Sequence, residues 1–220
     1  MTSRDTILGR LRAVTPPYAG EPPAPDDLLP VAPLDGGDRA ALVERFAAQA
    51  EALNSRVYRC GGADEALATI LQIVAPDTRV LCWAFEHIPL PGLAEALARA
   101  GVAVAPPGDA SVRVGITGAD AALAATGSLA LLSGPGQPRQ TSLLPLVHVA
   151  VVRADQVVPH LEAWIAGQRA RGLEAFAAAS SAVIISGPSR TADIAMELIL
   201  GMHGPGELHI VLLDDQTPDR

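Results

Sequence analysis

Apolar residues recur along most of the chain in short blocks, and the spacing within the blocks alternates between two patterns. Some blocks have the 3.6-residue period of an amphipathic helix, whereas others are short continuous runs typical of strands buried on both faces. Helices are predicted at 39–53, 64–74, 92–100, 155–170 and 190–201, and strands at 56–60, 78–84, 102–105, 112–116, 128–133, 147–153, 181–186 and 207–213. The alternation predicts an α/β fold in which an open parallel or mixed sheet lies between helical layers.

Shorter segments complete this pattern. Residues 120–125 read as a short helical turn and residues 138–144 as a one-turn helical segment. A helix is predicted at 2–14, followed by a proline-rich segment at 16–34, because proline removes a backbone donor and disfavours helix in the residue before it. We therefore divide the chain into an N-terminal helix and arm, residues 1–37, and one α/β domain, residues 38–220. A helix this short is marginal in water, so it is expected to pack on the domain or on a second subunit.

Composition narrows the classes of function. The chain has 220 residues, a net charge of −8 and only 3% aromatic residues, which argues against a nucleic-acid surface. Its basic residues are all arginine, so a Schiff-base or P-loop lysine is excluded. The two cysteines, Cys60 and Cys82, fit a reduced cytoplasmic protein, and two thiols cannot hold an iron–sulfur cluster within this chain alone. We expect no membrane insertion, because no apolar run approaches the length of a membrane span.

The candidate site begins with residues 115–142, the first block, where glycines alternate with hydroxyl residues and turns. Glycine allows close approach of a ligand, and serine and threonine supply hydroxyl donors. Arg139 is the best single candidate for an anion clamp, with an ordinary surface arginine as the alternative. The residues predicted to bind ligand in this block are Thr117, Gly118, Thr126, Gly127, Ser128, Arg139 and Thr141.

Residues 187–205, the second block, follow an apolar strand and open the helix predicted at 190–201. Helix N-termini attract anions, so this block reads either as a carboxylate or phosphate cradle or as an ordinary serine-capped helix, in about equal measure. Gly187, Ser189, Arg190 and Thr191 are its predicted ligand-binding residues. We expect the two blocks to form one cleft for a small anionic ligand.

The catalytic group is left open among four candidates. Asp120 can bind a hydroxyl, an amine or a metal, or can cap the short helix that it begins. His203 lies in a glycine turn, where it can act as an acid or base or can cap the preceding helix. Asp193 and Glu197 share one face of the predicted helix. Histidine and glutamate pairs with metal-ligand spacing are lacking, so a dedicated metal site is not predicted.

Both blocks carry recognisable motifs. The sequences GITGADAALAATGSL at 115–129, SGPG at 133–136 and TSLLP at 141–145 resemble the signature of the LUD domain family, and SGPSRTADI at 186–194 and LGMHGP at 200–205 resemble its second conserved segment. The resemblance implies a fold similar to that of ribose-phosphate isomerases, glucosamine-phosphate deaminases and CoA transferases. It also implies a role in oxidising L-lactate to pyruvate together with two iron–sulfur partner proteins, this chain being the subunit without clusters.

Two positions depart from the family pattern. Ala125 and Ala195 stand where the family often has acidic residues, which removes a carboxylate nucleophile or base at either place. Two other functions therefore stay open. One is a standalone enzyme acting on a sugar phosphate, a CoA ester or a folate, and the other is a non-catalytic assembly or regulatory subunit, in either case with homo-oligomerisation as an option.

Overall fold

The structure is a computed structural model that describes residues 3–13, 32, 34, 37–192 and 198–214. The chain divides into two compact units, Met1–Val31 and Ala32–Arg220. The first contains helix α1 (Ser3–Ala13), close to the helix predicted at 2–14. The second contains all the other elements, and the candidate site lies within it.

The second unit is organised around a six-stranded sheet in which every neighbouring pair is parallel. The strands lie side by side in the order β1 (Arg56–Cys60), β12 (Glu207–Leu213), β7 (Val147–Arg153), β4 (Val114–Thr117), β2 (Arg79–Cys82) and β3 (Ala103–Val104). The middle strands are continuous apolar runs because both of their faces are covered. Val149 and Ile210, for example, are completely buried. The predicted α/β fold class is confirmed.

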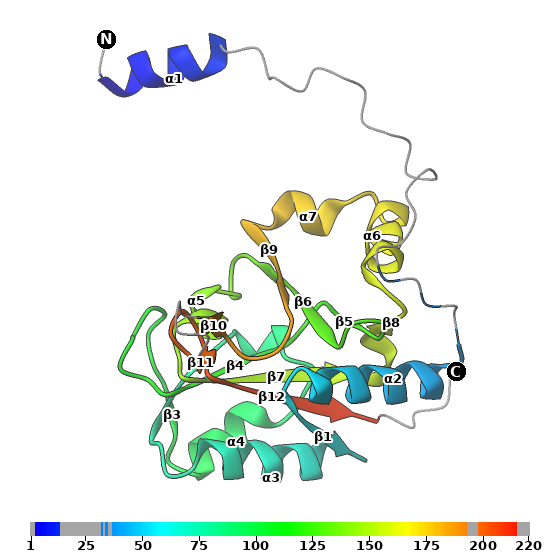
Figure 1. Ribbon diagram of the computed structural model, residues 1–220. Coiled ribbons are helices and arrows are strands. Elements are labelled where there is room, and N and C mark those ends of the chain that lie inside the picture. Colours follow the sequence, from blue (N-terminus) through cyan, green and yellow to red (C-terminus); the bar gives the residue numbers. More distant parts are fainter. Residues whose placement is uncertain (1–2, 14–31, 33, 35–36, 193–197, 215–220) are drawn as a thin grey trace. The chain divides into compact units, whose positions relative to one another are not determined.

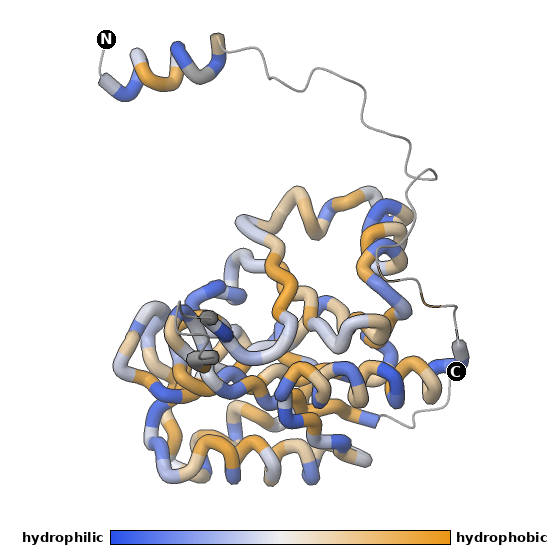
Figure 2. The backbone as a smooth tube through the Cα atoms, viewed as in Figure 1, coloured by the Kyte–Doolittle hydropathy of each residue, from blue (hydrophilic) through white to orange (hydrophobic). Residues whose placement is uncertain are grey.

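Different layers cover the two faces of this sheet (Figure 1). Helices α3 (Ala63–Val74) and α4 (Leu93–Arg99) lie on one face, and α2 (Arg39–Ala52) and the short α5 (Gln140–Leu143) lie on the other. Helix α2 begins at residue 39 because the Asp38 carboxylate accepts a hydrogen bond from the amide of Ala41, at 2.7 Å. Figure 2 shows apolar segments along the central strands and on the adjoining helices.

A smaller four-stranded sheet forms part of the layer that carries α2 and α5. Its order is β8 (Val157–Val158), β5 (Ala121–Leu123), β6 (Ser128–Ser133) and β9 (Ser181–Ile185). Alternate residues of β6 face opposite ways: Leu129 and Leu131 belong to the main core, whereas Ala130 and Leu132 pack in a cluster with Trp164 of α6 (Leu161–Ala170). The covering layer is therefore a sheet as well as helices, which the sequence did not predict.

Three predicted helical segments are wrong in whole or in part. Residues 121–123 form β5, because pairing with β6 outweighs the helix preference of alanine and leucine. The helix predicted at 155–170 begins only after Pro159, with a 3₁₀ turn (Ala154–Gln156) and β8 in its first part. In place of the helix at 190–201, β10 (Arg190–Ala192) pairs antiparallel with β11 (Leu198–Leu200).

Over the described residues, each helix is too short or too polar to cross a lipid bilayer.

Candidate functional site

A pocket of about 230 Å³ lies between the two blocks of sequence, and we call it the inter-block pocket. Ser142 of α5 and His148 of β7 line it from one side. The end of β9 and the turn after it supply Ser186 and Ser189, and the 203–205 turn supplies His203. The structure therefore brings Ser142, at the end of the first block, against the second block, with β7 and β9 as further walls. Of the predicted ligand-binding residues, Gly187 and Ser189 line this pocket.

The buried base of this pocket is a histidine paired with a threonine. His148 Nε2 lies 2.9 Å from Thr117 Oγ1, and the two residues are 1% and 0% exposed. Both side chains point to the same face, because His148 pairs in register with Gly115, two residues before Thr117. Burial lowers the pKa of His148 to about 3, so the imidazole is neutral at physiological pH. It offers hydrogen bonds to a ligand without a positive charge.

A chain of hydroxyl groups reaches the same pocket from the first block. The Thr126 hydroxyl donates to Ser128 Oγ at 2.9 Å, and Ser128 Oγ lies 2.7 Å from the hydroxyl of Ser186, which lines the pocket. Gly127 between them has a φ of 66° and packs directly against the backbone of α2 at Ala50. This glycine serves packing, and the neighbouring hydroxyls contact the pocket through Ser186.

The second block forms a turn and a hairpin. The Ser189 amide donates to the carbonyl of Pro205 at 2.8 Å, and the Gly201 amide donates to the carbonyl of Ser189 at 3.0 Å, so the two ends of the block are tied together. Because residues 190–192 are a strand, the expected anion cradle at a helix N-terminus is absent from this described segment. Asp193 and Glu197, two of the catalytic candidates, lie outside the described residues.

The two arginines predicted to bind an anion, Arg139 and Arg190, do not line the inter-block pocket. Arg190 donates a hydrogen bond to the carbonyl of Leu53, and Gly187 packs against the same carbonyl. Arg139 is exposed at the start of α5. Thr141 is buried with its carbonyl against Gly115, and Thr191 pairs with Ile199 across the hairpin. The inter-block pocket is thus lined by hydroxyls, imidazoles and apolar groups, without a guanidinium among its described lining residues.

Comparison with known proteins shows which family of domains the chain is similar to. Residues 108–213 match the LUD domain. Nearly half of the chain is thus similar to the LUD domain family. A "Lactate utilization protein C" from Exiguobacterium is 29% identical over 94% of this chain and 91% of its own length. Another protein of that name, from Halalkalibacterium halodurans, is 38% identical over 47% of this chain and 45% of its own length.

A solved structure supports the fold of this chain. A DUF162 family protein from Deinococcus radiodurans aligns with a TM-score of 0.60 and 22% identity, over 83% of this chain and 100% of its own. The likeness extends well beyond the residues that match the LUD domain, so the first strands and helices of the second unit belong to the same fold.

Asp120 and Gly118 of the LUD domain lie away from the inter-block pocket, next to the 3₁₀ turn η2 (Phe85–His87). Gly118 contacts the carbonyl of His87. The Asp120 carboxylate accepts a hydrogen bond from the Leu132 amide at 2.6 Å. Burial raises the pKa of Asp120, although the Leu132 amide and the charge of His87 oppose the shift. Nothing in the spacing of the residues around His87 marks it in the sequence as a neighbour of Asp120.

The carboxyl edge of the parallel sheet holds a second cavity, of about 610 Å³, which sequence reasoning missed. Gly62 before α3, Phe85 of η2, and Arg153 and Leu213 at the ends of β7 and β12 line it. Open α/β sheets bind ligands at this edge. The pair Gly61-Gly62 between a strand and a helix was the available signal. We call this the carboxyl-edge cavity.

The two thiols of this chain are held in their unreactive, protonated form. Cys60 is 1% exposed, and burial raises the pKa of Cys82 to about 12, so both remain protonated at neutral pH. Within the described residues, no group of three or more histidine, cysteine, aspartate or glutamate side chains is arranged to hold a metal ion.

Proposed function

We propose that this protein is the subunit without iron–sulfur clusters of an L-lactate utilisation system, and that it binds a small hydroxy or oxo acid in the inter-block pocket. Relatives named for lactate utilisation support the role, and one of them aligns over nearly the whole chain. The presence of only two cysteines supports the absence of a cluster. Iron–sulfur proteins are then the expected partners, and they would carry the electrons from lactate oxidation.

The observation that supports this ligand is the make-up of the inter-block pocket. Hydroxyls of Ser142, Ser186 and Ser189 and two imidazoles provide hydrogen bonds, while Val183 and Leu208 provide an apolar wall. A short aliphatic acid with a hydroxyl or keto group presents the complementary surface, and about 230 Å³ is small for anything much larger. The neutral His148 suits a hydroxyl or keto oxygen, and the exposed His203 lies where a carboxylate would enter.

Binding can be tested directly by calorimetry with L-lactate and with pyruvate. Val183→Phe fills the pocket from β9 and should weaken binding at least about tenfold, a loss of about 1.4 kcal/mol. Ala182→Phe is the matched control, because Ala182 is an exposed residue of the same strand that does not line the pocket, so this substitution should leave affinity unchanged. Equal affinity in the wild type and in Val183→Phe would place the ligand elsewhere.

The physiological role needs a genetic test. Bacillus subtilis has a relative named "Lactate utilization protein C" that is 34% identical over 103 residues. In a strain that lacks this relative, expression of the present chain should restore growth on L-lactate, and the Val183→Phe variant should not. Growth restored equally well by Val183→Phe would argue against ligand binding in this pocket while leaving the role in lactate utilisation intact.

A non-catalytic assembly subunit is the second candidate, and an exposed apolar surface favours it. Leu143, Leu146 and Leu200 are 41%, 63% and 48% exposed around the mouth of the inter-block pocket and beside it. Monomeric proteins rarely leave such groups clustered at the surface without a partner. Leu146→Glu should abolish co-purification with the iron–sulfur partners while leaving lactate binding unchanged, whereas loss of lactate binding alone would favour the first candidate.

A further inference from the structure

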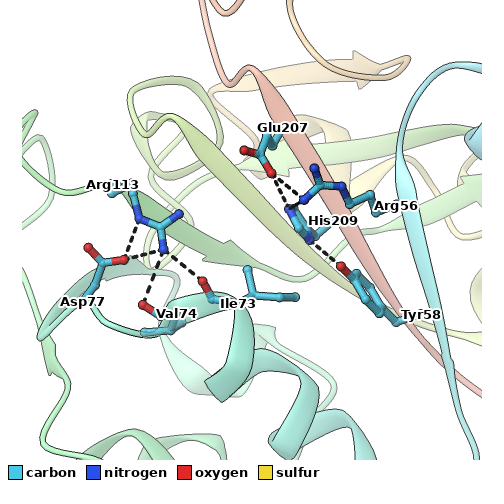
Figure 3. Close-up of polar contacts among 8 residues, drawn as sticks. All are labelled: Arg56, Tyr58, Ile73, Val74, Asp77, Arg113, Glu207 and His209. Carbon is cyan, nitrogen blue, oxygen red and sulfur yellow. Dashed lines mark hydrogen bonds and ion pairs between the residues drawn. The ribbon is translucent and has the colours of Figure 1, made fainter.

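A cluster of charged and aromatic side chains lies at the amino edge of the main sheet, where β1 and β12 begin (Figure 3). Arg56 is the first residue of β1 and Glu207 the first of β12. Parallel pairing places Arg56 in register with His209, and Tyr58 of β1 lies on the same face. Two pairs of polar side chains, separated by 151 positions in the sequence, thus meet at one point.

Hydrogen bonds fix the histidine in this cluster. His209 Nε2 lies 3.1 Å from the Glu207 carboxylate and 3.4 Å from Arg56 Nη1. The shorter contact is to a carboxylate, which can only accept, and it favours the tautomer with the proton on Nε2. His209 Nδ1 then accepts from the Tyr58 hydroxyl, at 3.0 Å. The two rings are stacked, with centroids 5.7 Å apart. His209 is 4% exposed, and burial lowers its pKa, with the Arg56 and Arg113 charges adding to the effect.

Two guanidinium groups face the cluster with unused donors. Arg56 Nη1 donates to Glu207 at 2.7 Å. Arg113, just before β4, is held by Asp77 at 2.7 Å and by the carbonyl of Ile73 at 3.0 Å, through Nε and Nη2. Among the described residues, Nη1 of Arg113 and the Nε and Nη2 of Arg56 have no protein acceptor. The contacts to Asp77 and Ile73 orient Arg113 in advance, which lowers the entropy lost when it binds a ligand.

A cavity of about 450 Å³ opens onto these donors, and we call it the amino-edge cavity. Both arginines, Tyr58, Glu207 and His209 line it. The pKa of Glu207 is lowered by the hydrogen bond from His209 and further by the charges of Arg56 and Arg113. The Glu207 carboxylate therefore stands where the protein stabilises negative charge, yet its side chain is 46% exposed and can turn out into solvent.

We propose that the amino-edge cavity binds a small oxyanion, a carboxylate or a phosphate, which takes the place of the Glu207 carboxylate between Arg56 and His209 and faces Arg113. Glu207 then acts as an internal substitute for the ligand. The apolar side chains of Ile73 and Pro76 in the same cavity leave room for a carbon skeleton attached to the anionic group. This site is separate from the inter-block pocket and does not depend on the function proposed for it.

Two substitutions with opposite expected signs test the proposal. Glu207→Gln removes the competing negative charge and should tighten binding of inorganic phosphate and of acetate about tenfold, whereas Arg56→Gln removes a positive charge and should weaken it about tenfold. A purely structural ion pair would not produce these opposite changes in affinity. Calorimetry measures them, and comparing phosphate with acetate distinguishes the two oxyanions.

Two further variants serve as controls. Arg59→Gln alters an arginine of the same strand that pairs instead with Glu44 and Asp214, so affinity should not change. Val183→Phe, in the inter-block pocket, should also leave phosphate binding unchanged. The ¹⁵N signals of His209 should shift on titration in the wild type. Absence of saturable binding by a folded Glu207→Gln variant at about 50 mM of both anions, or changes of the same sign in the two test variants, would overturn the proposal.

Discussion

The two glycine-containing blocks differ in what their glycines do. In the first block, a β-carbon on Gly115, Gly118 or Gly127 would collide with the backbone of Thr141, His87 or Ala50. In the second block, Gly187 also packs against a backbone carbonyl, that of Leu53, but a β-carbon on Gly204 would lie 3.4 Å from the side chain of Ser189, an ordinary contact distance. The first block therefore needs glycine so that backbones can touch, whereas Gly204 is needed for the conformation of a turn.

This difference changes how such blocks should be interpreted. Glycine next to hydroxyl residues suggested a ligand site along the whole of residues 115–142, yet several of these glycines contact protein. Ser142 is the described residue of the first block that lines the inter-block pocket. Thr117 and Ser128 contact the pocket through His148 and Ser186, which lie outside that block. Close packing within the first block thus holds polar groups in place, and the second block supplies the other walls of the pocket.

The largest effect is expected for Gly127→Ala. Collision with Ala50 adds to the cost of a positive φ, and together they should destabilise the fold by about 4 kcal/mol. Gly101→Ala is the matched control, because Gly101 has a φ of 73° and open space around it, so it should lose only about 1 kcal/mol. Urea unfolding measures both. Similar losses in the two variants would mean that α2 can move away and that the contact is not essential.

Thr117→Val should have the next largest effect. Valine has nearly the same shape but leaves His148 Nε2 buried without its partner, at a cost of about 1–3 kcal/mol. The exposed Thr126 offers a control, because Thr126→Val should cost about 0.5 kcal/mol or less. If Thr117→Val proves neutral in urea unfolding, His148 has another partner and its place at the base of the pocket must be revised.

Gly204→Ala should have a smaller effect on the free energy of unfolding than on the affinity for lactate. The backbone of Gly204 has a φ of 155°, which costs a side chain about 1 kcal/mol or somewhat more. Because the 203–205 turn lines the pocket, lactate affinity should fall as well. Calorimetry and urea unfolding on the same sample separate the two effects. A stability loss as large as that of Gly127→Ala would remove the contrast between the blocks.

The smallest expected effect concerns Asp120, and it is the direction in which stability changes with pH. Its folded-state pKa is raised, so the folded state holds the proton longer than the unfolded state, and this group's contribution to stability falls as pH rises through that window. Asp120→Asn keeps an acceptor for the Leu132 amide but cannot ionise. Its urea midpoint should therefore decline less between pH 4 and pH 7 than that of the wild type, a range that begins near the ordinary aspartate pKa of about 3.9. An identical pH dependence would show that Asp120 does not titrate in this range.

The sequence predicted the central sheet and strands β6 and β9 of the small sheet, but it did not predict β5, β8 or the β10–β11 hairpin, for one physical reason. Strands such as 147–153 are buried on both faces, so their apolar runs are visible in the sequence. Residues 190–201 have a composition that favours a helix, and only the pairing of Arg190–Ala192 with Leu198–Leu200 makes the described parts strands. Ala121–Leu123 is a strand for a similar reason, because β6 pairs with it.

The site was partly predictable on the same terms. The two blocks were recognisable by composition, and the structure joins them at one pocket. The pairing of Thr117 with His148 depends on the register of β4 and β7, and that of Tyr58 with His209 depends on the adjacency of β1 and β12. Neither the register nor the adjacency of these strands can be derived from the local spacing of residues. Arg139 and Arg190 were chosen because they stood beside glycine turns, and the direction in which their side chains point could not be derived from that.

Strand β12 has an experimental consequence, because its two ends serve different cavities. Glu207 and His209 line the amino-edge cavity, and Leu213 lines the carboxyl-edge cavity. The seven residues of β12 span six steps along the strand, or about 20 Å, which exceeds the Debye length of about 8 Å at physiological salt. A change of charge at one end should therefore hardly alter the electrostatic potential at solvent-exposed groups at the other end. Reporter groups placed at the two edges would give independent signals from a single molecule.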